Sequence, residues 1–137
     1  NYKKHIIKRD KMLGEKFYDV ISHEGSVSIT SWTSKGAHVT CTWNTYLQIE
    51  DGDSEKILIP AAGMTSTEND IKENNEVILT MAAREVEGFN GYQGTGFRIV
   101  GTAEFLDEGE YFEKVHDKFP SANRALVVDV KEAKQLL

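Results

Sequence analysis

The chain has 137 residues, a length that suits one domain with a single hydrophobic core. Its 16 lysines and arginines against 22 aspartates and glutamates give a formal net charge of −6, which disfavours nucleic acid and anionic membrane surfaces as partners. No apolar run reaches the roughly 20 residues of a membrane-spanning helix, so we expect no membrane span. The single cysteine excludes an internal disulfide, which agrees with a reducing compartment, and we predict a cytoplasmic protein.

The first part of the chain predicts an antiparallel sheet. Residues 1–11 are basic and polar, so we expect a flexible N-terminal extension ahead of a domain at 12–137. Helical spacing of apolar residues predicts a first helix over 12–23. Beyond it, alternating β-branched and hydroxyl residues, separated by turn residues, predict strands at 25–32, 37–49 and 56–60. Two consecutive hairpins favour antiparallel pairing.

The second part adds strands and short helices. A helix is predicted over 65–75, since Thr65 and Glu68 have capping-box spacing. The glycine-rich stretch 88–96 precedes a strand, so we interpret it as a flexible hairpin connection and not as a dinucleotide-binding loop, which would precede a helix. The other predicted elements are strands at 76–86, 97–106 and 124–130, a helix at 108–119 and a short helical tail. The fold class is therefore mainly β, a closed or split antiparallel barrel of six strands with short flanking helices.

Catalytic and metal-binding patterns are weak in this sequence. Cys41 has no nearby base or positive charge in the sequence that would make its thiol reactive, so we predict a structural role. Acidic pairs lie in predicted turns, where water solvates them. The histidines lack metal-site spacing and are interpreted as solvated or structural residues; they are His5, His23, His38 and His116. We therefore predict neither a catalytic residue nor a metal site.

The stretch PAAGMTST, residues 60–67, combines features that suit a phosphate-bearing ligand. A proline ends the strand, small residues follow, and the hydroxyl residues at 65–67 stand beside the N–H groups of a helix start. The same hydroxyl residues are also common helix caps, so the stretch alone leaves both interpretations open. Upstream, Trp43, Asn44 and Tyr46 offer aromatic surface and an amide to a planar ring system, or belong to the core.

Four runs taken together resemble the small FMN-binding proteins of the pyridoxamine-phosphate-oxidase-like split-barrel family. They are TWNTYL at 42–47, IPAAGM at 59–64 followed by Thr67-Glu68, GTGF at 94–97 and RALVV at 124–128. The resemblance covers the chain from about Met12 to Leu137. It implies a homodimeric split β-barrel that binds FMN noncovalently near the dimer interface. It also implies electron transfer, with an unidentified redox partner protein or nicotinamide donor.

The resemblance assigns the cofactor-binding residues by position. It implies that Thr42 and Thr67 hold the phosphate. Ala61 and Ser66 are predicted to belong to the same site because they lie in the stretch at 60–67. The wall around the isoalloxazine ring is implied to consist of Trp43, Asn44, Pro60, Ala62 and Gly63. The family has a lysine where this chain has Ser66 and an asparagine where it has Cys41, so a cation and a hydrogen-bond partner are missing. Helix-terminal N–H groups or Arg84 are the predicted substitutes for the cation.

Two alternatives remain beside a dimeric electron carrier. One is a flavin-dependent reductase or oxidase of the same fold that adds a substrate or nicotinamide pocket. The other is a barrel that binds a different ligand, such as haem or a deazaflavin, or that serves only as an interaction module.

Overall fold

The computed structural model describes residues 11–137, so the predicted extension at 1–11 lies outside the described residues except for Lys11. The helices are α1 (Glu15–Ile21), α2 (Thr65–Glu73) and α3 (Glu110–Lys118), and the 3-10 turns are η2 (Asn44–Tyr46) and η3 (Phe89–Gly91). The strands are β1 (Ser26–Thr33), β2 (Gly36–Trp43), β3 (Gln48–Asp51), β4 (Glu55–Ala61), β5 (Glu76–Glu87), β6 (Gln93–Leu106) and β7 (Arg124–Gln135). None of the helices in residues 11–137 has the length and apolar character needed to span a bilayer.

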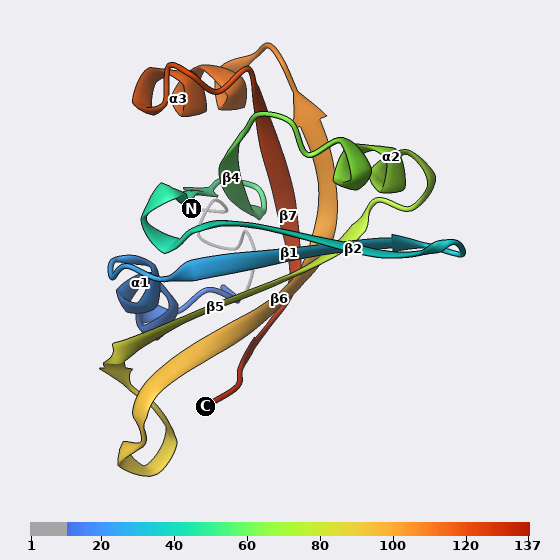
Figure 1. Cartoon of the computed structure of the whole chain (residues 1–137). Helices are drawn as coiled ribbons and strands as arrows, with labels where there is room; N and C mark the ends of the chain where they lie inside the picture. The colour runs from blue at the N-terminus through green and yellow to red at the C-terminus, as the bar shows by residue number, and fades with distance from the viewer. Residues whose placement is uncertain (1–10) are drawn as a thin grey trace, which may run out of the picture.

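The strands form one seven-stranded sheet in the order β2-β1-β5-β6-β7-β4-β3, with β2 and β3 at its edges. Every pairing is antiparallel. The sheet is strongly twisted and curled, and its long strands cross one another in the view of Figure 1. The prediction of a mainly β, antiparallel fold with short helices is confirmed, but residues 11–137 form seven strands and not six.

The extra strand arises because the predicted strand at 37–49 is interrupted at Asn44. The chain turns there through η2 and continues as β3. The backbone N–H of Asn44 donates to the carbonyl of Gly25 over 2.8 Å, and its side chain is completely buried. These contacts stabilise the turn in a stretch whose residue types would also suit a continuous strand.

The predicted helical tail is wrong, because β7 continues as a strand to Gln135. Its last part pairs with the first half of β6, where Phe97 faces Gln135. This pairing outweighs the helix propensity of the tail residues. A bulge at Lys131 moves the register from the pair Val100–Glu132 to the pair Gly101–Val130. Glycine is required at 101, since a Cβ there would lie 2.4 Å from a backbone oxygen of β7.

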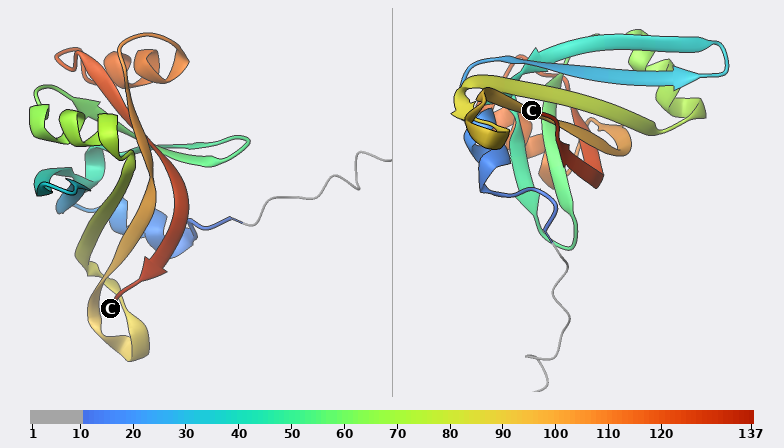
Figure 2. Two further views of the ribbon diagram at one scale, coloured as in Figure 1. Left: turned by 90° about the vertical axis from the view of Figure 1, so that its right-hand side faces the viewer. Right: turned by 90° about the horizontal axis from the view of Figure 1, so that it is seen from below.

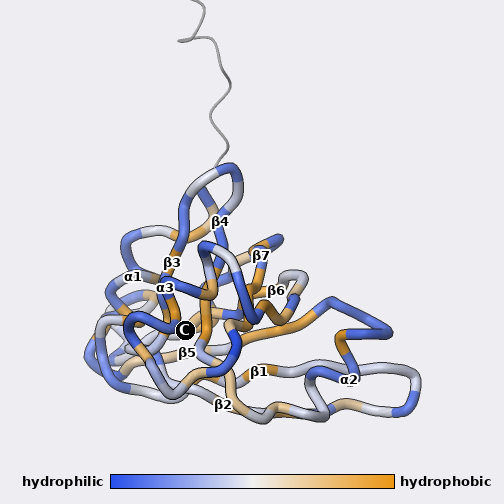
Figure 3. Tube along the Cα trace, turned by 90° about the horizontal axis from the view of Figure 1, so that it is seen from above, coloured by the Kyte–Doolittle hydropathy of each residue, from blue (hydrophilic) through white to orange (hydrophobic). Residues whose placement is uncertain are grey.

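The main core lies inside the curled sheet. Alternate residues of the strands meet there, including Leu79 of β5, Ile99 of β6 and Leu126 of β7. Helix α1 contributes Phe17 and Val20, which are fully buried against these strands. Figure 3 shows the apolar stretches of β6 and β7 in orange, whereas α2 is mostly pale or blue.

A smaller cluster lies on the other face of β4 and β7. Helix α3 packs there through Val115, which meets Leu58 of β4 and Val127 of β7. Figure 2 shows α3 at the far end of these strands from the C-terminus. Since both faces of β4 are covered, its central residues are buried without alternation. The loop between α3 and β7 is thereby fixed near the end of β4, where the chain enters α2.

Candidate functional site

A groove runs along β2, between that strand and the segment that joins β4 to α2. On β2, His38, Thr40 and Thr42 face the inner side of the sheet, since Thr40 and Thr42 are paired with the core residues Ile29 and Val27. Because side chains alternate along a strand, the residues between them face outward. The polar side chains of these three residues of β2 therefore point into the groove.

Two adjoining pockets make up this groove. The first, here called the aromatic pocket, has a volume of about 300 Å³ and is lined by Cys41, Thr42, Trp43, Tyr46, Pro60, Ala61, Ala62, Met64, Phe119, Ser121 and Ala122. The second, the helix pocket, measures about 270 Å³ and is lined by His38, Val39, Thr40, Met64, Thr65, Ser66 and Thr67. Met64 lines both pockets. Ligand sites typically measure about 300–1,000 Å³, so the two pockets together suit one elongated molecule.

The helix pocket is built on an uncapped helix start. Gly63 and Met64 have φ angles of 75° and 56°, so two successive residues adopt the left-handed region before α2 begins. Such a conformation is costly for methionine and is typical of functional turns. Met64 is the N-cap and makes no side-chain capping bond, so the predicted capping box of Thr65 and Glu68 is wrong. Within residues 11–137, the N–H groups of residues 65–67 have no hydrogen-bond acceptor.

Two buried threonines in the groove also lack partners. Thr67 is 2% exposed and lines the helix pocket, and Thr42 is 7% exposed and lines the aromatic pocket. Neither hydroxyl makes a hydrogen bond within the described part of the chain. Neither oxygen is among the fully enclosed polar atoms of the described residues that lack a partner, so both stay accessible from the groove. Three free N–H groups and two such hydroxyls therefore fit an anionic ligand that enters the groove.

Behind the helix pocket lies a buried carboxylate. Asp70 of α2 accepts hydrogen bonds over 2.8 Å from the hydroxyl of Ser31 and over 2.8 Å from Nδ1 of His38. These two bonds, that of His38 above all, hold the pKa of Asp70 below its ordinary value. Asp70 is therefore ionised at neutral pH and fixes the His38 ring at the mouth of the pocket.

The aromatic pocket has a flat, weakly polar lining. Trp43 is 50% exposed at the end of β2. Tyr46 and Phe119 contact each other, with ring centroids 4.7 Å apart. Pro60, Ala61 and Ala62 line the opposite side with little side-chain bulk. Because aromatic and small residues allow a planar group to come close, this end of the groove suits a ring system.

Most of the residues predicted for the site come together, but two lie elsewhere. Thr42, Trp43, Pro60, Ala61 and Ala62 line the aromatic pocket, and Ser66 and Thr67 line the helix pocket. Gly63 lines neither pocket, and its carbonyl accepts a hydrogen bond from Arg124.

Asn44 is the second residue outside the groove. Its amide nitrogen donates to the carbonyls of Val20, His23 and Ala82 over 3.0–3.3 Å. Its side chain is completely buried, and no atom of it lines either pocket. Asn44 therefore joins η2 to α1 and β5 in the interior.

Several residues that line the groove carry no local signal in the sequence. Phe119, Ser121 and Ala122 come from the loop before β7, and no local pattern predicts that this loop meets β4. His38 and Thr40 did carry a signal, because they alternate with Thr42 along one predicted strand. The strand alternation places all three on one face, so His38 lines the groove and is not merely a solvated or structural histidine.

The cations near the groove differ in their availability. Arg124 pairs with Glu68 over 2.8 Å and is already neutralised. Arg84, the substitute considered from the sequence, lines a different cavity. No carboxylate lines the groove in the described residues, and His38 is the one basic side chain that does.

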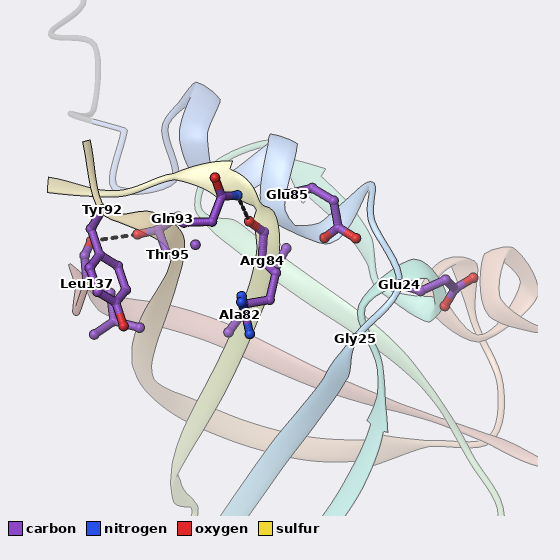
Figure 4. Close-up of a pocket in the computed structure, with 11 residues that line it drawn as sticks. Glu24, Gly25, Ala82, Arg84, Glu85, Tyr92, Gln93, Thr95 and Leu137 are labelled. Atoms are coloured by element: carbon purple, nitrogen blue, oxygen red, sulfur yellow. Dashed lines mark hydrogen bonds between the residues drawn. The ribbon is translucent and has the colours of Figure 1, made fainter. Parts of the chain in front are cut away.

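The cavity around Arg84 is larger, at about 540 Å³, but its chemistry suits an anion less well. Glu24 and Glu85 line it together with Arg84. Figure 4 shows the two glutamates on the side opposite Tyr92 and Leu137, with Arg84 between the two groups. The hydroxyl of Thr95 already donates to the carbonyl of Leu137 over 2.7 Å. Because the acidic residues oppose negative charge, we place the candidate site in the groove and not in this larger cavity.

Comparisons with known proteins identify the family of this chain. The family model described as pyridoxamine 5'-phosphate oxidase matches residues 13–136. The FMN-binding protein of Nitratidesulfovibrio vulgaris is 40% identical over 126 residues, which cover 92% of this chain and 100% of that protein.

Solved structures share the fold at lower identity. The HupZ protein of group A Streptococcus has a TM-score of 0.72 and 19% identity, over 91% of this chain and 94% of its own. An FMN-binding protein from Syntrophomonas wolfei has a TM-score of 0.68 and 18% identity, over 92% of this chain and 86% of its own. The prediction of a split β-barrel of this type is thereby confirmed.

Proposed function

Since this chain belongs to the pyridoxamine 5'-phosphate oxidase family, we propose that it binds FMN noncovalently in the groove along β2. The observation that carries the proposal is that the hydroxyls of two largely buried threonines, Thr42 and Thr67, have no partner within the described residues and stay accessible from the groove. The similarity to a protein named for FMN binding supports the same cofactor.

The helix pocket would hold the phosphate. The free N–H groups of residues 65–67 stand at the positive end of the α2 dipole, where anions are stabilised. The Thr67 hydroxyl would donate to a phosphate oxygen and so gain the partner that it lacks. Ser66, which is exposed, stands where the resemblance implies a lysine, so the site would depend on hydrogen bonds more than on a flexible cation.

The aromatic pocket would hold the ring system. Trp43 offers a face for stacking, and Ala61 and Ala62 permit close approach from the other side. The hydroxyl of Thr42 stands beside Trp43 and is available to a polar atom of the cofactor. These contacts orient the flavin and exclude water from part of it.

FMN would supply reversible electron transfer, while the protein sets the potential and the exposure of the flavin. We propose a role as an electron carrier, because the residues that line the groove include no carboxylate in the described part of the chain. The net charge of −6 opposes added negative charge on a bound flavin and so lowers its reduction potential. The redox partner, a protein or a nicotinamide donor, is left open by this proposal.

We further propose that the protein is a homodimer. The outer face of the β1–β2 hairpin carries no charged side chain along its paired strands, and β2 is an open sheet edge. The residues of that face are Ser26, Ser28, Thr30, Trp32, Ala37, Val39, Cys41 and Trp43. Val39 is 68% exposed and Trp43 50%, and apolar edges of this kind are normally covered. Because Cys41 and Trp43 also line the aromatic pocket, this interface would adjoin the cofactor.

The absorption spectrum of the purified protein tests the cofactor proposal. We expect a flavin spectrum, or its appearance after FMN is added, and the mass of the acid-released cofactor should be that of FMN. A protein that is colourless and fails to take up added FMN contradicts the proposal. Release of haem, FAD or a deazaflavin would instead support a barrel with another ligand.

A charge-matched pair of variants tests the position of the phosphate. Thr67→Glu sets a carboxylate beside the phosphate and should weaken FMN binding more than tenfold, over about 1.4 kcal/mol. Asn69→Glu adds the same charge to an exposed position of α2 and should change the dissociation constant much less. Equal effects of the two variants would contradict the assignment.

Two further measurements separate a dimeric carrier from its alternatives. Thr30→Arg adds a charge to the centre of the outer face and should yield monomers in sedimentation, whereas Asn69→Arg should not. A wild-type monomer that holds FMN contradicts the proposed interface. In stopped-flow experiments, rapid and saturable reduction of the flavin by NADH or NADPH would contradict the role of electron carrier and indicate a flavin reductase.

A further inference from the structure

One basic side chain faces the helix pocket, and it belongs to a histidine held by a buried acid. The side chain of His38 is 51% exposed, while that of Asp70, which accepts its Nδ1–H over 2.8 Å, is 6% exposed. The same carboxylate oxygen accepts the hydroxyl of Ser31. The ring is therefore oriented from behind, and its second nitrogen is not engaged within the described residues.

From this arrangement we propose that His38 is the cation that recognises the phosphate of bound FMN, in place of the lysine that Ser66 replaces. The proposal rests on the proposed function, since it assigns a role within the same groove. It joins three independent features of the pocket: the oriented imidazole, the free N–H groups of α2 and the unpartnered hydroxyl of Thr67. Asp70 is a positioning residue that acts through the ring.

The protonation of the ring decides whether it attracts the phosphate. A carboxylate only accepts hydrogen bonds, so the bond to Asp70 keeps one ring proton on Nδ1. In a neutral ring Nε2 then carries a lone pair, which repels a phosphate oxygen. Once Nε2 is protonated it donates a charge-assisted hydrogen bond instead. FMN affinity should therefore be high when the imidazole is charged and should fall as the pH rises and the ring loses this proton.

The other charged groups around His38 do not account for the expected pH dependence of FMN affinity. The other residues that line the helix pocket carry no ionisable nitrogen or carboxyl group. On α2, Asp70 faces the ring, and Glu68 is paired with Arg124. On β1 the cross-strand partner of His38 is Ser31, which does not titrate. The phosphate itself is largely a dianion above about pH 6, so pH changes above neutrality report on the protein.

Binding of FMN and of riboflavin, which lacks the phosphate, tests the proposal. For the wild-type protein we expect the FMN dissociation constant to rise at least fivefold from pH 6.5 to pH 8.5, while that for riboflavin changes less than twofold. His38→Gln should weaken FMN about tenfold at pH 6.5, remove the pH dependence and leave riboflavin unchanged. His38→Lys, whose charge persists over this range, should bind FMN tightly at both pH values.

His23→Gln is the matched control, because His23 also pairs with an aspartate, Asp19, but lies outside the groove. It should leave both flavin affinities and the pH profile unchanged. The proposal is overturned if His38→Gln binds FMN like the wild type, or if it loses riboflavin to the same extent as FMN. If the wild type binds neither flavin, the proposed function fails as well, so the two failures are distinguishable.

Discussion

Two regions of this protein bury polar side chains, and they treat them in opposite ways. In the first, the α1 anchor, Asn44 and Glu55 are completely buried and bind backbone groups on either side of α1. Glu55 accepts the N–H groups of Met12 and Leu13 over 2.7 and 3.1 Å. In the second, the groove, the buried threonines have no partner in the described residues.

The difference separates polar residues that serve the fold from polar residues that serve a ligand. Buried polar groups are normally hydrogen-bonded. In the α1 anchor the amide nitrogen of Asn44 and the carboxylate of Glu55 follow this rule, whereas the side-chain oxygen of Asn44 has no partner in the described residues. Thr42 and Thr67 depart from it at the two pockets that line β2. Because the oxygens of both threonines stay accessible from the groove, a ligand there can supply the acceptor that the described residues do not.

The largest effect should come from the α1 anchor. Asn44→Ala removes three hydrogen bonds and leaves three carbonyls with fewer partners, so it should lower the free energy of unfolding by about 2–4 kcal/mol. Urea denaturation without flavin measures this loss. The control is Thr45→Ala, since the Thr45 hydroxyl makes only exposed bonds and should matter little. A loss no larger than that of the control would mean that Asn44 is not structural.

The groove should show the opposite behaviour. Thr67→Val keeps the shape of the side chain and removes the unpartnered hydroxyl, so stability without flavin should be unchanged or raised. The FMN dissociation constant should rise tenfold or more, about 1.4 kcal/mol, because a bond to a charged phosphate is lost. Isothermal titration calorimetry and urea denaturation measure the two quantities, with the exposed Ser66→Ala as control. Lost stability with unchanged FMN binding would place Thr67 among the residues of the fold.

The two pockets of the groove should differ from each other more modestly. Trp43→Leu removes a stacking face from the aromatic pocket and should weaken FMN and riboflavin alike, by about 0.5–1.5 kcal/mol. Stability should change little, since Trp43 is half exposed. Fluorescence titration with both flavins checks this. A loss confined to FMN would assign Trp43 to the phosphate end instead.

The smallest effect concerns the acid that links the groove to the fold. The pKa of Asp70 is lowered in the folded state, chiefly by the hydrogen bond from His38. Its stabilising contribution is therefore complete above its ordinary pKa near 4 and is lost as the pH falls through the lower folded-state value. Asp70→Asn should flatten the decline in urea midpoint between pH 5 and pH 3. An unchanged profile would show that other carboxyl groups cause the decline.

The fold class and part of the groove could be predicted from the sequence, because they depend on local patterns of residues. Features that depend on contacts between distant segments could not. Period-2 alternation in β1 and the turn residues around β3 identify strands, because local burial patterns determine them. The break at Asn44 and the strand at the C-terminal end depend on distant partners, on Ala82 and on β6, which no local pattern contains. Thr42 and Thr67 were assigned by resemblance, whereas the missing bonds that distinguish them are visible only in three dimensions.

The ratio of riboflavin to FMN dissociation constants tests the central claim most directly, because the two ligands differ only by the phosphate. We predict that the wild-type protein prefers FMN by about a hundredfold, the value of two hydrogen bonds to a charged group. In the Thr67→Val protein, which lacks the hydroxyl of the helix pocket, the preference should fall to about tenfold or less at unchanged stability. Equal affinities of the wild type for FMN and riboflavin would contradict the claim that the groove is a phosphate-binding site.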